Sequence, residues 1–151
     1  TRVMAFLVPG WSQVFEIEGQ RLSAGYHGLS HHGNETKKIA EYNLVGREHV
    51  RRFARFLETL GNCKDHQDRS LLDSTTLVYG SGMGNSNTHD TSNLPTLIAG
   101  GDFSHGNHWA IDRTSSKSRL LGDLMLTLMQ RMGMGIDAFA GARHNMNECL
   151  V

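Results

Sequence analysis

Two apolar runs on either side of a polar, glycine-rich segment constrain the fold of this chain more than any other feature. The first run, Thr75 to Tyr79, leads into the sequence GSGMGNSNTHDTSN, and the second extends from Leu94 to Ala99. Apolar runs rich in β-branched and aliphatic residues and bounded by turn residues are typical of strands. The pattern therefore predicts a strand, a loop carrying His89 and Asp90, and a second strand. Because ligands of open α/β sheets bind at strand ends, this loop is a candidate site.

A long amphipathic helix is predicted between the N-terminal third and the first of these strands. Apolar residues recur at spacings of three and four from Ile39 to Leu60, with charged residues between them, and Gly61 ends the pattern. Asn34 precedes the helix and is predicted to be its N-cap, because its side-chain oxygen can accept a hydrogen bond from a free backbone amide of the first turn.

A second amphipathic helix is predicted from Leu120 to Met132, with Ser116 or Ser118 as its cap and Gly133 as its end. Near the N-terminus, residues 2–8 read RVMAFLV, which predicts a strand buried on both faces. Most of residues 11–33 follow no period of 2 or 3.6, so a long loop is predicted there. A loop of that length favours a functional role.

The order strand, loop, helix, strand, strand, helix predicts an α/β layer architecture with a mostly parallel sheet flanked by helices. The chain has 151 residues, enough for one α/β domain spanning residues 1–151 but not comfortably for two. Since it starts without Met, we expect it to have been cut from a longer protein. Cys63 and Cys149 lie far apart without CxxC spacing, so they define neither a disulfide framework nor a zinc knuckle.

Charge and hydropathy exclude two classes of partner. Fifteen basic residues balance fifteen acidic ones, so no electrostatic signal for nucleic acid or an anionic membrane surface is present. No apolar run approaches the roughly 20 residues of a membrane span. We therefore expect no nucleic-acid partner and no membrane span.

Glycines and histidines are the residues that invite a chemical interpretation. Gly80, Gly82 and Gly84 follow a strand, but neither a P-loop, a dinucleotide fingerprint nor a nucleophile elbow is matched, and a tight backbone path explains them better.

Five of the nine histidines fall in two clusters, namely His27, His31 and His32, and then His105 and His108. The first cluster suits either hydrogen-bonded structural roles or metal binding, with His89 as a third ligand. The second cluster suits either a shared ligand or an ordinary surface turn. A metal site requires the side chains of the first cluster and His89 to approach within about 5 Å, because Zn–N bonds are only about 2 Å long.

The chain resembles the C-terminal half of the domain of unknown function 1552 family in a series of segments: YHGLSHHGN, the long amphipathic helix, LLDSTTLVYGSGMGNSNTHDTSNLPTLIAGG, and HGNH followed by a Leu-rich helix ending in QRMG. The resemblance covers nearly all of residues 1–133. It implies an exported bacterial protein, periplasmic or extracellular, whose partner is the N-terminal half of its own parent protein.

A more distant similarity links the chain to the alkaline phosphatase and sulfatase superfamily. His27 and His31 stand where that superfamily has an Asp-x-x-x-His pair, Gly82 to Asn85 where it has Asp-His-Gly-Asn, and His89 where it has a His before a strand. The similarity implies an alkaline-phosphatase-like C-terminal portion that keeps one of two metal sites. The nucleophile would lie upstream of Thr1.

These observations lead to two hypotheses. The first is a metal-dependent hydrolase of phosphate or sulfate esters, with one divalent ion, zinc by preference, held by His27, His31 and His89. Further groups assigned to the site are His32 and Asp90 as alternative ligands or outer hydrogen-bond partners, Asn85 as a substrate contact, and His105 and His108 as additional ligand contacts. The alternative is a non-catalytic binding or assembly module that contacts protein or glycan.

Overall fold

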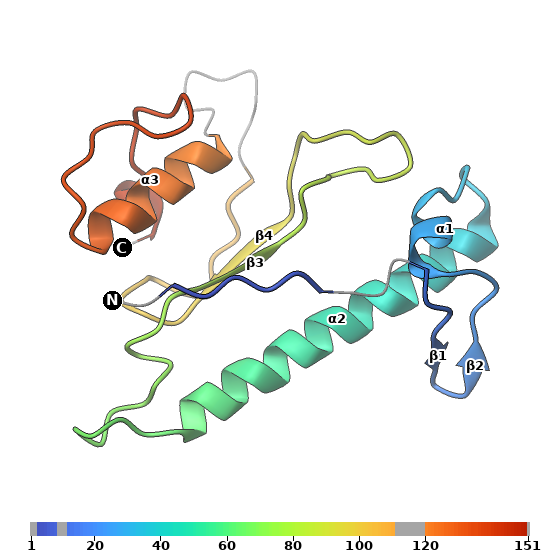
Figure 1. Ribbon diagram of the computed structural model, residues 1–151, viewed down its shortest axis with the longest axis horizontal. Coiled ribbons are helices and arrows are strands. Elements are labelled where there is room, and N and C mark those ends of the chain that lie inside the picture. The colour runs from blue at the N-terminus through green and yellow to red at the C-terminus, as the bar shows by residue number, and fades with distance from the viewer. Residues whose placement is uncertain (1–2, 9–11, 111–119, 151) are drawn as a thin grey trace. The chain divides into compact units, whose positions relative to one another are not determined.

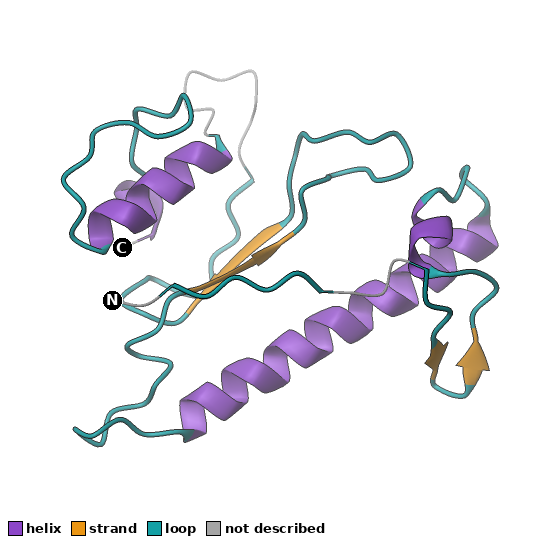
Figure 2. Ribbon diagram, viewed as in Figure 1, coloured by secondary structure: helices purple, strands orange, loops and turns teal. Residues whose placement is uncertain are grey.

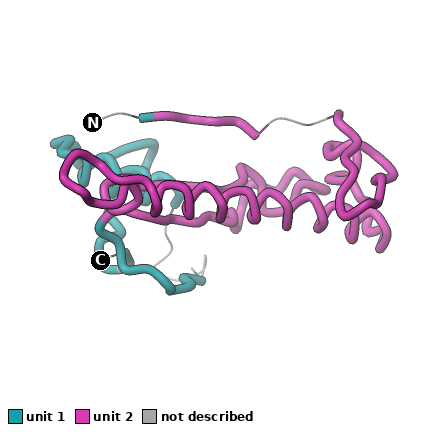
Figure 3. Tube along the Cα trace, turned by 90° about the horizontal axis from the view of Figure 1, so that it is seen from below, with its two compact units in different colours: residues 1–3, 102–151 teal, residues 4–101 magenta. Residues whose placement is uncertain are grey.

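The structure, a computed structural model, describes residues 3–8, 12–110 and 120–150. The chain divides into two compact units, which are coloured separately in Figure 3. The larger unit is Met4–Gly101, and the smaller comprises Asp102–Val151 together with Thr1–Val3. The His27, His31 and His89 side chains all belong to the larger unit.

The larger unit begins its regular structure with a short hairpin and a helix pair. Strands β1 (Glu16–Ile17) and β2 (Gln20–Arg21) are antiparallel and are followed by α1 (Tyr26–Ser30) and α2 (Thr36–Asn62), as Figures 1 and 2 show. The core between them consists of Leu22, Leu29 and Val45, each at most 3% exposed. Partly buried side chains surround this core: Val14, Phe15, Ile17, Ala24, Tyr26, Tyr42 and Leu44.

Helix α2 confirms the long helix predicted from the apolar period. It runs for 27 residues and ends at Asn62, one residue beyond the expected end. The predicted cap is wrong, because Glu35 occupies the N-cap position and Asn34 has a positive φ of 64°. Asn34 therefore turns the chain just before the helix and does not cap it. Cys63, which follows α2, is a free and exposed thiol.

Strands β3 (Leu77–Gly80) and β4 (Thr96–Ala99) confirm the positions of the two predicted strands, but their pairing overturns the predicted fold class. They are antiparallel, with Val78 opposite Ile98 and Tyr79 opposite Leu97. In the described residues the sheets are the two antiparallel pairs β1–β2 and β3–β4, so the mostly parallel, alkaline-phosphatase-like sheet is wrong. Parallel neighbours need a crossover connection, usually a helix, and residues 81–95 contain none.

Residues 3–8 do not form the predicted buried strand. They belong to no helix or strand, and Phe6 and Leu7 are 86% and 80% exposed. The local sequence does favour an extended backbone, but a strand also needs a neighbour to pair with. No described strand pairs with this segment.

The smaller unit is built on α3 (Leu121–Arg131), which confirms the second predicted helix, and it also contains the short α4 (Asn147–Leu150). Asp123 is buried and stabilises the start of α3, since its Oδ2 accepts the Leu120 amide at 2.8 Å and its Oδ1 accepts the His144 amide at 3.2 Å. The predicted caps Ser116 and Ser118 lie outside the described residues. Gly133 follows the helix with a φ of 88°, as its predicted role requires.

Candidate functional site

The loop between β3 and β4 reaches back to α1 and packs against the segment that follows it (Figure 1). The amide of Gly33 donates to Asn87 Oδ1 at 2.9 Å. The hydroxyl of Ser86 lies 3.4 Å from the Ser30 carbonyl oxygen and 3.2 Å from the Tyr42 hydroxyl. Polar side chains of the loop thus connect it to α1 and α2, which brings together two regions more than 50 residues apart in sequence.

This packing places three of the predicted site residues together. His27 lies in α1, His31 directly follows α1, and His89 lies in the β3–β4 loop. The ring centroids of His27 and His31 are 4.8 Å apart, and those of His31 and His89 are 4.9 Å apart. His31 is therefore the central ring of a histidine triad, as we call these three residues from here on.

Local structure explains how each ring of the triad is positioned. The four-residue spacing of His27 and His31 places them on one side of the α1 turn, and the Ser30 hydroxyl closes that turn by donating to the His27 carbonyl at 2.7 Å. His89 adopts a positive φ of 55°, which is uncommon for a residue with a Cβ. This conformation belongs to a sharp turn in which the His89 amide points to the Ser86 carbonyl at 3.4 Å.

The triad offers the right donors for a transition-metal ion, although the rings do not surround a common centre. Two imidazoles on one tetrahedral zinc have centroids about 5 Å apart, given Zn–N bonds of about 2.0–2.1 Å. The observed spacings match, but the rings meet edge to face, at 74° and 88°. Accordingly, no group of three or more His, Cys, Asp or Glu in the described part of the chain is arranged to hold an ion. Metal binding would require side-chain rotation, which the exposure of His27 and His89 permits.

The other predicted site residues lie outside the triad. His32 Nδ1 accepts the Asn34 amide at 3.0 Å, so in the neutral ring the proton is on Nε2 and neither nitrogen offers a lone pair to an ion. Its ring lies 6.5 Å from that of Tyr42. His105 and His108 belong to the smaller unit and are exposed on a segment without helix or strand.

Asn85 and Asp90 organise the β3–β4 loop. The Asp90 carboxylate accepts the Ser92 amide and hydroxyl, both at 2.8 Å, and Asn85 Oδ1 accepts the Asn87 amide at 3.0 Å. The backbones of Asn85 and Asp90 also form an isolated antiparallel bridge. These oxygens hold the turn that carries His89.

Two of the three glycines at the start of this loop lie where a side chain would not fit. A Cβ on Gly80 would be 2.7 Å from the Pro95 carbonyl oxygen, and one on Gly84 would be 2.0 Å from that of Ser92. A Cβ on Gly82 would meet nothing within 4 Å. The tight backbone path predicted from the sequence is thus found at Gly80 and Gly84.

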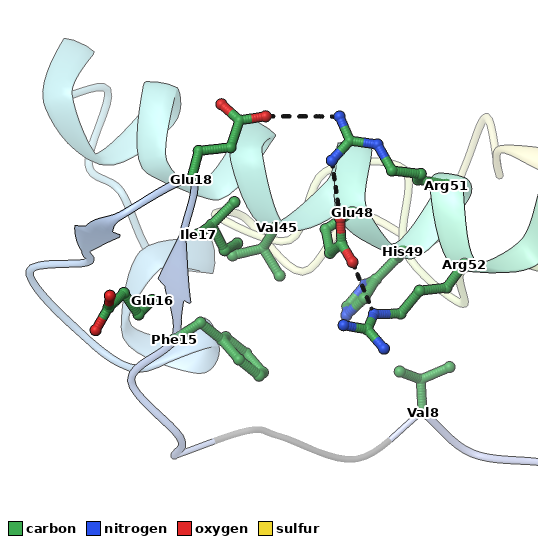
Figure 4. A pocket seen from close by; sticks show the side chains of 10 residues that line it. All are labelled: Val8, Phe15, Glu16, Ile17, Glu18, Val45, Glu48, His49, Arg51 and Arg52. Carbon is green, nitrogen blue, oxygen red and sulfur yellow. Dashed lines mark hydrogen bonds and ion pairs between the residues drawn. The ribbon is translucent and has the colours of Figure 1, made fainter.

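A pocket between the β1–β2 hairpin and α2 was not predicted (Figure 4). Apolar side chains line part of it, while Arg51 bridges Glu18 at 3.5 Å and Glu48 at 3.0 Å, and Arg52 pairs with Glu48 at 2.9 Å. The sequence could have indicated these ion pairs, because Glu48, Arg51 and Arg52 stand three and four residues apart on the predicted helix. Both arginines form ion pairs with carboxylates. The charged residues of this pocket therefore neutralise one another and do not form an acid–base pair for catalysis.

Burial and the neighbouring Arg52 lower the pKa of His49, which lines the same pocket. Both effects disfavour the imidazolium form. The neutral imidazole of His49 is therefore favoured, and its ring packs edge to face with Tyr26 at 5.3 Å. This histidine has a packing role in the α1–α2 core.

Comparison with known proteins identifies no relative: no family model, curated protein or solved structure matches the chain. Among the described helices, none is long and apolar enough to cross a membrane. The functional argument therefore depends on the histidine triad and its surroundings.

Proposed function

We propose that this chain binds one divalent transition-metal ion, preferably zinc, through His27, His31 and His89. The observation that carries the proposal is the contact of three imidazole rings supplied by two distant segments. Imidazole is a good ligand for zinc, copper, iron and nickel, whereas Mg²⁺ and Ca²⁺ prefer oxygen. A set of three histidines without a carboxylate therefore favours the first group of metals.

The hydrolytic reaction proposed for this site is the cleavage of phosphate or sulfate esters. His27, His31 and His89 would hold the zinc ion, which would supply Lewis-acid chemistry toward an ester oxygen. The chain itself would contribute binding and orientation. Ser86 and Asn87 would fix the loop that carries His89, and the exposure of His27 and His89 would leave the site open to a substrate.

A second candidate function is a non-catalytic metal-dependent binding module. It is favoured by the exposure of two of the three rings, because active sites usually close and expel bulk solvent when they act. Zinc binding without turnover of aryl phosphates or aryl sulfates would support this second function over the first.

Isothermal titration of the chelator-stripped chain with Zn²⁺ tests the metal site. We expect one equivalent to bind, and His31→Ala to weaken binding by more than about 100-fold, the upper end of the cost of losing an outer partner of a metal ligand. His89→Ala should have a similar effect. His66→Ala is the matched control, because His66 is exposed and outside the triad.

Two results would contradict the metal site. One is a wild-type chain that takes up no stoichiometric zinc. The other is equal zinc affinity in the wild-type chain and in the His31→Ala and His89→Ala variants, which would move the binding to other residues.

A further inference from the structure

Residues 3–8 form an apolar segment that pairs with no described strand, although Val8 at its end lines the pocket beside α2. Their sequence is VMAFLV, and the exposed fractions of Val3, Met4, Phe6 and Leu7 lie between 77% and 86%. None of the hydrogen bonds between described residues involves this segment. Six residues without charge, proline or glycine, in which both alternating faces are apolar, have the composition of a strand buried inside a sheet.

The β3–β4 sheet, in turn, has room for a further strand at its edges. Among the described residues each of its two strands pairs on one side only, which leaves amide and carbonyl groups at its outer edges without a strand partner. One face packs on α2, where Tyr79 stacks on Phe53 with centroids 4.8 Å apart. On the other face Val78 is 41% exposed. A hairpin of two strands is marginally stable in water, and a third strand would strengthen it.

The accessible surface of the chain supports an additional partner. The chain exposes 10767 Å², whereas a compact monomer of its 16.8 kDa would expose about 7,700 Å². Even two separate compact units of half that mass would together expose about 9,200 Å². The exposed area is larger than either value.

We propose that residues 3–8 of one copy add as a third strand to the β3–β4 sheet of a second copy, and that the exchange is reciprocal. Each copy carries one unpaired apolar segment and one two-stranded sheet, and the described residues of the two do not pair within a chain. In a dimer of two copies related by a twofold axis, the segment of each copy pairs with the sheet of the other. Such a dimer is a closed assembly that does not grow further. The added strand places one apolar face toward α2 and the other beside Val78. This proposal is independent of metal binding.

Light scattering coupled to size-exclusion chromatography tests the dimer. The wild-type chain should have twice the mass of 16.8 kDa, and Leu7→Asp should halve the observed mass. Because Leu7 is 80% exposed in the single chain, the substitution leaves the fold of the monomer intact, which circular dichroism checks. Met134→Asp is the matched control, since Met134 is also apolar and exposed but lies elsewhere, and it should remain a dimer.

Amide hydrogen exchange distinguishes strand addition from unspecific apolar contact. Residues 4–8 and the β3–β4 strands should be protected in the wild-type chain and lose that protection in Leu7→Asp. A monomeric wild type, an open-ended series of oligomers, a dimer that survives Leu7→Asp, or a dimer with unprotected residues 4–8 would overturn the proposal.

Discussion

Glu41 is a buried carboxylate that links α2 to the segment before α1. It is 2% exposed, and its Oε2 accepts hydrogen bonds from the amide and the hydroxyl of Ser23. The Ser23 hydroxyl and then the Ser23 amide hold the pKa of Glu41 below its usual value. The ionised form is therefore favoured in the folded state.

The lowered pKa of Glu41 predicts how stability depends on pH. Because the folded pKa lies below the unfolded value of about 4.3, the stabilisation is complete above that pH and is lost as the pH falls through the folded pKa. We expect Glu41→Gln to be less stable than wild type at pH 7, with the difference disappearing in acid. Urea unfolding at a series of pH values measures this.

The exposed Glu58 of α2 supplies the control for this prediction. Glu58→Gln should leave the pH dependence unchanged. A Glu41→Gln variant whose stability runs parallel to that of wild type down to pH 3 would show that the Ser23 contacts do not depend on the charge.

At the scale of elements, the β3–β4 loop is the part of the fold on which the candidate site depends. Its conformation is set by the bridge between Asn85 and Asp90, by the Gly84 amide that donates to the Asp90 carbonyl at 2.9 Å, and by the left-handed backbone of His89. A disturbance at Gly84 would therefore be transmitted to His89.

Gly84→Ala is predicted to destabilise the chain by about 1–3 kcal/mol, because the new Cβ would overlap the Ser92 carbonyl oxygen, which lies 2.0 Å away. Its zinc affinity should fall as well, since the loop must move. Gly82→Ala, with open space around its Cβ, should stay within about 0.5 kcal/mol of wild type. Equal unfolding curves for the two variants would mean that the loop adapts freely.

At the scale of the whole molecule, the triad joins two regions of the larger unit, so a bound metal should resist their separation. Zinc at a hundred times its dissociation constant is expected to add about 2.7 kcal/mol to the free energy of unfolding. Far-UV circular dichroism during urea unfolding reports this, because α2 with its 27 residues dominates the signal. His89→Ala should show no such gain, while His66→Ala should retain it. A gain of equal size in His89→Ala would place the stabilising zinc elsewhere.

The sequence by itself determined the elements whose signals are local. The apolar period predicted α2 and α3, and the two apolar runs predicted the positions of β3 and β4, because helix period and strand composition act over a few residues. The position of the helix cap also depends on local sequence, but its prediction was wrong by one residue. Asn34 and Glu35 are adjacent polar residues, and the apolar period does not distinguish between them.

Tertiary structure alone decided how these elements combine. The direction of β4 relative to β3 and the unpaired state of residues 3–8 depend on which strand lies beside which, and those contacts are non-local. The meeting of His31 with His89 likewise depends on the packing of the β3–β4 loop through Ser86 and Asn87. Ser and Asn are common in all loops, so their presence in the sequence did not single out the residues that bring the triad together.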